Sequence, residues 1–300
     1  MKVSSFKYFL AVAETGSIRQ AAKNLHVSAS AISRQIQNLE HNFKSTLFER
    51  KAQGMVLTEE GKIIEKHMRK TMREMDLAQV EINEIHGLLT GTVSYSAIEG
   101  VLNSWLLPAI AKFQEDYKGI RFDGEISASD GVYHSLTSDQ ADLGIALEGE
   151  IQPEIEIIKR FETGFKIALS PNHQLANKKD VQIEDLAPFP LAMLSTRFHT
   201  RHLLESLSIR KHLPFNITFE LDNIEILKQF ILTTNGATIL PDFALINEMN
   251  DKSLTIIDIN KGAFPITTTV LCIRKGRHLT KAARHFIEFI RDIDITQQNK

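Results

Sequence analysis

Apolar residues recur at intervals of three and four along the first forty residues, a spacing that predicts three short helices. The first is expected over residues 4–14. The second is expected to begin at Ser17, because Gln20 follows at the spacing of a capping box. After a tight turn, Ser28 or Ser30 can cap the third. The buried stripe of the third helix, at i, i+4 and i+7, is Ile32, Ile36 and Leu39.

The opposite face of the third helix is polar and has few carboxylates. Hydroxyl, amide and guanidinium groups are suited to phosphates and to base edges in a major groove. This pattern predicts a helix-turn-helix that binds DNA, and an ordinary helical hairpin with a solvated face is the alternative. Two apolar stretches around Gly54 then predict a β-hairpin wing that carries cations toward phosphate or the minor groove. The candidate DNA contacts are Ser28, Ser30, Ser33, Arg34, Gln37, Arg50 and Lys51.

Residues 59–89 predict one long amphipathic helix of about 45 Å, which Thr58 can cap. Its apolar positions alternate spacings of four and three, as in a heptad seam. A second copy of this helix is the expected partner for the seam, and packing on the chain's own C-terminal part is the alternative. The seam consists of Ile64, Met68, Thr71, Met75, Ala78, Ile82, Ile85 and Leu89.

From residue 90 onward, apolar strand patterns alternate with amphipathic helix patterns in two successive halves. This alternation predicts an α/β domain of two lobes with parallel sheets. The expected strands cover residues 92–98, 120–126, 142–147, 165–170, 189–194, 236–241 and 270–274. The expected helices cover residues 106–113, 133–137, 223–234 and 280–291.

Charge divides the chain at the same place as the hydrophobic pattern. Residues 1–58 hold eight Lys and Arg against three Glu, a net of +5, while the rest of the chain holds 27 against 34, a net of −7. A basic module joined to an acidic one is typical of a DNA-binding head with a second function attached. The single cysteine, the absence of a signal peptide and the absence of a long apolar run predict a cytoplasmic protein with no membrane span.

Many of these residues match one known family in order and spacing. Residues 1–61 resemble the DNA-binding domain of the LysR-type transcriptional regulators. The matching pieces are Phe9-Leu-Ala-Val-Ala13, Gly16-Ser17, Ala21-Ala22, Leu25, Val27-Ser28, Ile32-Ser33-Arg34-Gln35-Ile36, Leu39-Glu40, Leu47-Phe48-Glu-Arg50 and Leu57-Thr58-Glu-Glu-Gly61. Ala29 stands where the family often has a glutamine that can read a base, and we include it among the DNA-binding candidates. Phe43-Lys44 replaces the family's usual Leu-Gly.

The later part of the chain resembles the effector domain of the same regulators, which is similar to periplasmic solute-binding proteins. The similar pieces are Leu107-Pro108, Asp142-Leu-Gly-Ile-Ala, Ser170-Pro-Asn-His173-Gln-Leu-Ala176, Asn235-Gly236, Leu240-Pro241 and Ala282-Ala-Arg-His-Phe286. The resemblance implies double-stranded DNA, a small-molecule effector of unknown identity, a homodimer or homotetramer and, for an activator, RNA polymerase as partners. It implies no cofactor beyond that effector.

The expected architecture has three parts. They are a winged helix-turn-helix domain over residues 1–58, a linker and dimerisation helix over 59–89, and an effector-binding domain over 90–300. Within the last part, lobe I is expected near residues 90–162 and 268–300, and lobe II near 163–267.

Ligands of two-lobed α/β folds bind at the carboxyl ends of strands, beside helix N-termini. The predicted effector residues are Ser96, Ile98, Glu99, Gly100, Ser129, Ser195, Thr196, Arg197 and Asn223. Arg197 could clamp an anion. Glu99 would repel one, so we hypothesise an effector that carries an amine as well as an acid, or is not a plain carboxylate. The alternative is that Glu99 points to solvent or pairs with an arginine.

A metal site and an enzyme are two further hypotheses for this sequence. His199 and His202 have an i, i+3 spacing that could hold a metal, but no third ligand is evident, so a surface position is expected and no metal site is predicted. Nucleophile-elbow, phosphate-loop and zinc-protease motifs are absent, which argues against an enzyme. The rival hypothesis is a cytosolic small-molecule-binding or enzymatic α/β protein with an incidental N-terminal helical domain.

Overall fold

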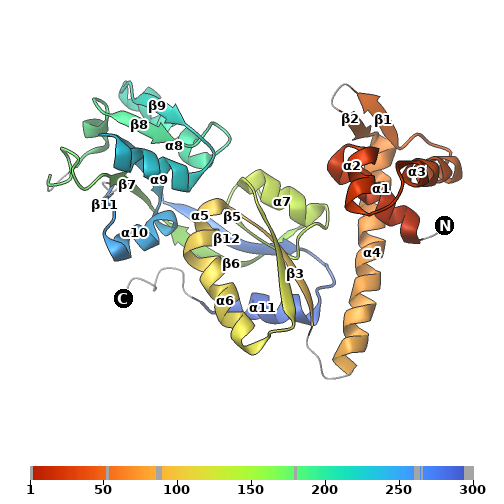
Figure 1. The fold of residues 1–300 in the computed structure, drawn as a ribbon. Helices are drawn as coiled ribbons and strands as arrows, with labels where there is room; N and C mark the ends of the chain where they lie inside the picture. The colour runs from red at the N-terminus through yellow and green to blue at the C-terminus, as the bar shows by residue number, and fades with distance from the viewer. Residues whose placement is uncertain are drawn as a thin grey trace. The chain divides into compact units, whose positions relative to one another are not determined.

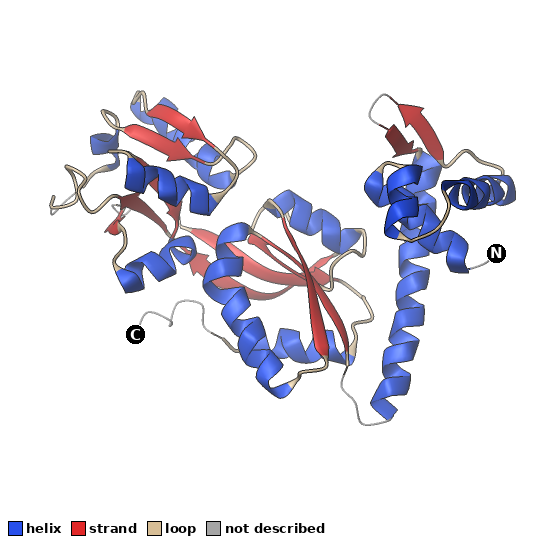
Figure 2. Ribbon diagram, in the orientation of Figure 1, coloured by secondary structure: helices blue, strands red, loops and turns tan. Residues whose placement is uncertain are grey.

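The computed structural model describes residues 3–51, 54–85, 90–178, 181–259, 264 and 266–293. The chain forms two compact units, Met1–Leu88 and Leu89–Lys300. Figures 1 and 2 show helices and a β-ribbon in the first unit, and sheets with covering helices in the second.

The first unit is a three-helix head followed by a wing and a long helix (Figure 1). A small apolar core holds the head together, centred on Phe9, Ile32 and Leu39. Because the buried stripe predicted for the third helix lies in this core, its polar face is left to solvent. The elements are α1 (Val3–Thr15), α2 (Ile18–Asn24), α3 (Ala29–Phe43), β1 (Phe48–Lys51), β2 (Gly54–Leu57) and α4 (Glu59–Ile85).

Hydroxyl side chains start three of these helices. Ser17 Oγ accepts a hydrogen bond from the Gln20 amide at 3.3 Å, but the Gln20 side chain bonds Asn24 instead of returning to Ser17. The predicted capping box is therefore only half formed. Ser28, rather than Ser30, caps α3 through the Ala31 amide at 3.2 Å. Thr58 caps α4 in the same way, accepting from the Gly61 amide at 2.9 Å.

Lys44 ends α3 in the left-handed conformation, with φ of 51°. An L-residue with a Cβ pays about 1–2 kcal/mol for this backbone shape, which glycine adopts freely. The departure from Leu-Gly at Phe43-Lys44 therefore leaves the turn in place and adds strain to it.

Helix α4 has two different halves. Met68 is buried in the core of the head, whereas Met75 and Ile82 are about half exposed, at 49% and 50%. Beyond the core of the head, the predicted seam therefore forms an apolar stripe that is exposed to solvent. Leu89, the last residue predicted for the seam, lies outside the described residues.

The second unit contains two five-stranded sheets, one in each lobe (Figure 2). In lobe I the strand order is β4-β3-β5-β12-β6, and in lobe II it is β11-β7-β10-β8-β9. Lobe I strands are β3 (Gly91–Ala97), β4 (Ile120–Ile126), β5 (Leu143–Leu147), β6 (Ile155–Thr163) and β12 (Thr267–Arg274). Lobe II strands are β7 (Phe165–Leu169), β8 (Pro190–Met193), β9 (Asn216–Glu220), β10 (Ala237–Pro241) and β11 (Thr255–Asp258).

The prediction of parallel sheets is wrong for part of each lobe. Strand β3 is parallel to β4 and β5, but β12 runs antiparallel to both β5 and β6. In lobe II, β7 is antiparallel to β10 and β11. A parallel neighbour requires a crossover connection on the same sheet, whereas β12 enters lobe I from lobe II without one. Its direction therefore depends on how the chain passes between the lobes.

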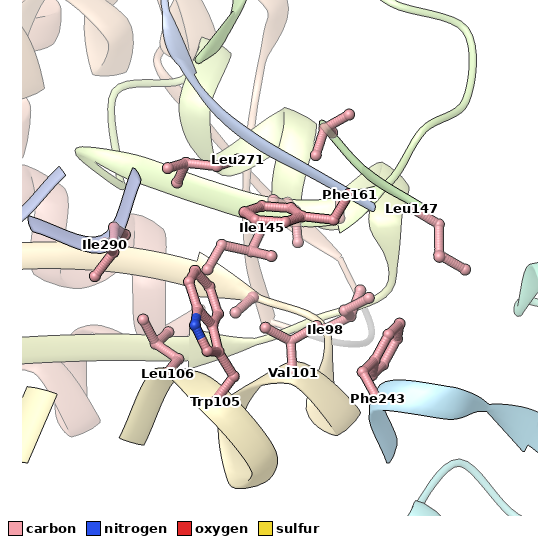
Figure 3. Packing of buried hydrophobic residues seen from close by; sticks show 14 of the residues in the cluster. Ile98, Val101, Trp105, Leu106, Ile145, Leu147, Phe161, Phe243, Leu271 and Ile290 are labelled. Atoms are coloured by element: carbon pink, nitrogen blue, oxygen red, sulfur yellow. The ribbon is translucent and has the colours of Figure 1, made fainter. Parts of the chain in front are cut away.

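Helices cover both faces of the lobe I sheet. Helices α6 and α11 lie on one face and α7 on the other (Figure 1). Trp105 is fully buried beneath the sheet and meets Phe161 edge to face at 5.7 Å between ring centroids (Figure 3). The helices of the unit are α5 (Glu99–Val101), η1 (Leu102–Leu106), α6 (Leu107–Asp116), α7 (Ser129–Thr137), η2 (Ile183–Leu186), α8 (His199–Lys211), α9 (Ile224–Thr233), η3 (Asp242–Leu245), α10 (Ile246–Asp251) and α11 (Lys281–Arg291).

The lobes are joined where β6 passes into β7 through Gly164. The Gly164 amide donates to Asp242 Oδ2 at 3.0 Å, and the Asp242 amide donates back to the Gly164 carbonyl at 3.0 Å. Burial raises the pKa of the Asp242 carboxyl, while these backbone donors oppose that shift. This reciprocal pair fixes the point at which the chain leaves lobe I.

Candidate DNA-binding surface and effector cavity

A groove on the head is lined by the starts of α2 and α3 and by the wing. Five predicted DNA-binding residues line it together: Ala29, Ser30, Ser33, Arg50 and Lys51. Arg34 and Gln37 are also exposed on α3 but lie outside this groove, further along the helix. The Ser28 hydroxyl is occupied as the helix cap and lies 3.1 Å from Ser30 Oγ. Its role in the structure is therefore to begin the helix that presents the others.

Arg19 also lines the groove and was missed as a site residue. It lies in the first turn of α2, and only its contribution to the basic charge of the head was visible in the sequence. Arg19, Arg34 and Arg50 are exposed and form no ion pair within the described part of the head. Lys51 pairs with Glu49 at 3.4 Å, with both side chains about half exposed. The surface thus offers free guanidinium groups around a helix end, which suits phosphate oxygens.

Backbone contacts hold the wing against the head. The Met55 amide donates to the Gly16 carbonyl at 2.8 Å, and Gly54, with φ of 120°, passes so close that a Cβ there would lie 2.5 Å from the same oxygen. A similar approach occurs at the start of α4, where a Cβ on Gly61 would lie 2.1 Å from the Leu47 carbonyl oxygen. The two glycines are required because backbone from another element occupies the space of a side chain.

A cavity of about 180 Å³ lies in the second unit, lined by residues of both lobes. It contains five of the nine predicted effector residues: Ile98, Glu99, Gly100, Ser129 and Arg197. Apolar side chains make much of its wall, and Ile98, Leu147 and Phe243 lie together at one side of the lobe I core (Figure 3). Such a mixture of apolar wall and few polar groups is typical of a small-molecule site.

Four predicted residues do not line this cavity. Ser96 is fully buried within β3, and Thr196 is exposed on the loop before α8. Ser195 is engaged by Asp222, whose Oδ1 accepts from the Ser195 amide at 3.2 Å. Asn223 caps α9 by accepting from the Ile226 amide at 2.9 Å. These four residues either point away from the cavity or already form hydrogen bonds within the protein. Their positions at a strand end or a helix start did not predict this.

Glu99 bridges the two lobes. Its Oε2 accepts a hydrogen bond from the Ile224 amide, in the first turn of α9, at 2.9 Å. Burial raises the pKa of Glu99, and the α9 amides oppose that shift. Both readings in which Glu99 faces solvent or pairs with an arginine are therefore wrong. Its carboxylate instead occupies the positive end of a helix, which is where an anion is favoured.

Arg197 lines the cavity but is not a free anion clamp. Its guanidinium forms an ion pair with the Asp222 carboxylate. Hydrogen bonding from Ser195 lowers the pKa of Asp222, and Arg197 adds to this effect. The arginine charge is therefore compensated within lobe II before any ligand enters.

Ser129 also contributes differently from a free hydroxyl. It begins α7, and its Oγ accepts a hydrogen bond from the Leu147 amide at 3.2 Å. This bond ties the start of α7 to the end of β5. The lining hydroxyl is thus oriented by a backbone donor of the same wall.

The N-terminus of α8, a helix that was not predicted, supplies cavity residues beyond the nine predicted ones. His199, Thr200 and His202 all line the cavity. Partial desolvation lowers the pKa of His199, and the neighbouring His202 adds to the shift. The described residues contain no group of three potential metal ligands around this His-x-x-His spacing or elsewhere.

Asp130 and Glu148 are not among the nine predicted effector residues, and both line the cavity. Asp130 lies in the first turn of α7, and its carboxylate has no partner among the described residues. Glu148 is bound by the Arg160 guanidinium, with Nε at 2.9 Å from Oε1 and 3.1 Å from Oε2. The charge of Glu148 is therefore largely compensated, while that of Asp130 is not.

Two family models cover most of the chain. The bacterial regulatory helix-turn-helix protein, lysR family, matches residues 3–62, and the LysR substrate binding domain matches residues 86–293. The chain belongs to the LysR family of transcriptional regulators. It has the family's DNA-binding helix-turn-helix and effector-binding domain, and neither matched model describes an enzyme.

Individual LysR relatives agree with this assignment. A probable nitrogen assimilation transcriptional activator of Synechocystis sp. is 31% identical over 225 residues, covering 74% of this chain and 72% of the relative. The full-length CbnR complexed with its target DNA has the same fold, with a TM-score of 0.67, 19% identity and coverage of 97% and 99% of the two chains. The effector-binding domain of QuiR in complex with shikimate superposes with a TM-score of 0.56, at 19% identity over 67% of this chain and 95% of that one.

No helix in the described ranges is both long enough and apolar enough to cross a membrane. The apolar stripe of α4 is interrupted by many charged residues, so its hydropathy is that of an amphipathic helix.

Proposed function

We propose that this LysR-family regulator binds specific DNA sites as a homo-oligomer and changes its DNA binding when a small effector fills the cavity between its lobes. The observation that supports this most directly is the Glu99–Ile224 hydrogen bond, which joins the two lobes at the wall of the cavity. A ligand placed beside this bond interacts with both lobes at once. It therefore favours one lobe arrangement over another by its differential contacts, which is the requirement for coupling between sites.

The apolar half of α4 is the proposed route from effector domain to DNA. Met75 and Ile82 are about half exposed on the helix that follows the head. Pairing of two such helices buries this stripe and sets the spacing of two heads. A change in how the effector domains pack then changes that spacing. Dimer and tetramer both fit this scheme, and RNA polymerase is the further partner if the protein activates transcription. Its DNA target places it in the cytoplasm, and it needs no cofactor besides the effector.

The test is selection of DNA sites from a random library by the full-length protein, followed by binding measurements on the selected site and on bulk DNA. Two heads should select an inverted repeat with half-sites about 10 base pairs apart or a multiple of this distance. Arg34→Ala should weaken binding to the selected site by about tenfold and binding to bulk DNA much less, since one base contact is worth about 1–3 kcal/mol.

Lys7→Ala provides the matched control, because Lys7 is exposed on α1 and does not line the groove. If the selection returns no common site, or if Arg34→Ala weakens both kinds of DNA equally, sequence-specific reading by α3 is refuted.

A further inference from the structure

Three helices of eight residues or more, α7, α8 and α9, have their N-termini at the effector cavity, and they differ in their negative charge. Helix α9 has the Glu99 carboxylate at its first turn, and α7 has Asp130 in its own first turn. Helix α8 has no acidic residue in its first turn and no side chain that caps it. Since each N-terminus carries roughly half a positive charge, only that of α8 faces the cavity without an anion among these three described helices.

A buried threonine lies beside this uncompensated helix end. Thr200 is only 2% exposed, lines the cavity, and its side chain makes no hydrogen bond to any described residue. A hydroxyl that lines a cavity without a protein partner has its O–H donor available to a ligand. Together with the His199 and Thr200 amides of the first turn, it offers several donors to one acceptor group. A carboxylate fits this set of donors.

The other charged groups that line the cavity favour a cation rather than an anion. Arg197, the one Lys or Arg among the residues lining the cavity, is paired with Asp222. Among the described residues, Asp130 forms no ion pair. Glu99 accepts its hydrogen bond from a backbone amide, and the nearby cation Lys228 is already paired with Glu225 and Glu248. An ammonium group on the ligand would supply the missing counter-charge, which an anion alone could not.

We propose that the effector is a small zwitterion of the amino acid type, with its carboxylate at the N-terminus of α8 and its ammonium against Asp130 and Glu99. This inference rests on the proposed function, in which the same cavity takes the effector. The volume of about 180 Å³ suits a ligand of this size, since a cavity of roughly 150 Å³ admits benzene. The apolar wall takes the side chain of the zwitterion.

The test begins with thermal shifts of the full-length protein against the twenty common amino acids, in buffer with a chelator. The amino acid with the largest shift is then compared by calorimetry with its decarboxylated amine and its deaminated acid; for leucine these are 3-methylbutylamine and 4-methylpentanoate. We expect the amino acid to bind at least about tenfold more tightly than either analogue, because a charged hydrogen bond is worth about 1.5–3 kcal/mol.

Two conservative variants test separately how the carboxylate and the ammonium of the ligand are bound. Thr200→Val should weaken the binding of the amino acid and of the deaminated acid about tenfold, while the binding of the amine stays unchanged. Asp130→Asn should weaken the binding of the amino acid and of the amine, while the binding of the acid stays unchanged. The loss should be only a few fold, because Asp130 is exposed and its charge is screened. Glu150→Gln is the control for net charge, because Glu150 is exposed, follows β5 like Glu148 and does not line the cavity.

If no amino acid binds more tightly than its amine or acid, the inference is overturned. If the acid alone binds as tightly as the amino acid and Thr200→Val weakens its binding, the proposed ligand class is wrong. An effector in this cavity, and with it the proposed function, would still stand. Failure of the proposed function shows separately, as the lack of a selected DNA site.

Discussion

Replacing Arg50 by glutamine should flatten the salt dependence of DNA binding by a predictable amount. Arg50 is exposed on the wing, forms no ion pair in the described part of the head and lines the groove with Arg19 and Lys51. Each phosphate neutralised by a protein cation releases condensed counterions. The logarithm of the binding constant therefore falls against the logarithm of salt concentration with a slope of about −0.9 per phosphate contact.

The three groove cations give a slope of about −2.7 for one head and about −5.4 for two. Raising salt from 50 to 200 mM should then weaken binding about 40-fold for one head and about 2,000-fold for two. Arg50→Gln removes one contact from each head, so the two-head slope should become about −3.6 and the same salt change should cost about 150-fold. The wild-type slope thus also reports how many heads bind.

Fluorescence anisotropy with a labelled duplex, at five salt concentrations, measures these slopes. Lys7→Gln is the matched control, since it removes one exposed charge from the same head outside the groove. Its slope should equal that of the wild type. An unchanged slope for Arg50→Gln, or an equal change for Lys7→Gln, would refute the assignment of Arg50 to a phosphate and leave only a general effect of net charge.

Three further substitutions and treatments test other parts of the structure. Gly61→Ala should destabilise the head by about 2 kcal/mol or more in urea unfolding, because its Cβ would lie 2.1 Å from the Leu47 carbonyl oxygen; unchanged stability would show that the two backbones separate easily. Lys44→Gly should stabilise the head by about 1 kcal/mol by relieving the φ of 51°, with Lys44→Ala as the control for loss of the side chain. Burial raises the pKa of Cys272 to about 12, so iodoacetamide at pH 8 should label this thiol only after unfolding, and rapid labelling of the folded protein would contradict its burial in β12.

The Glu99 contact gives the cavity a built-in response to its contents. The bond between Glu99 and the Ile224 amide crosses from one lobe to the other. A cation that approaches Glu99 favours its ionised form, and a competing anion at the α9 end would displace the carboxylate from that end. The same contact can therefore distinguish ligands by charge as well as join the lobes.

Local patterns were sufficient to predict the head. The stripe of Ile32, Ile36 and Leu39 repeats at helical spacing, and caps such as Ser17 and Thr58 act within three residues of their partners. Interactions of this range are contained in a short stretch of sequence. For the same reason, the alternation of strands and helices was enough to predict an α/β effector domain of two lobes.

The effector cavity and the direction of some strands were decided only by the tertiary structure. Glu99 and Ile224 are 125 positions apart, and whether this carboxylate meets a helix end, an arginine or solvent depends on how the lobes pack. The antiparallel direction of β12 depends likewise on the passage of the chain between lobes. Sequence periodicity reports which face of an element is buried, but carries no information on which distant element covers it, so the partners of Glu99, Arg197 and Thr200 could not be predicted before the lobes were assembled.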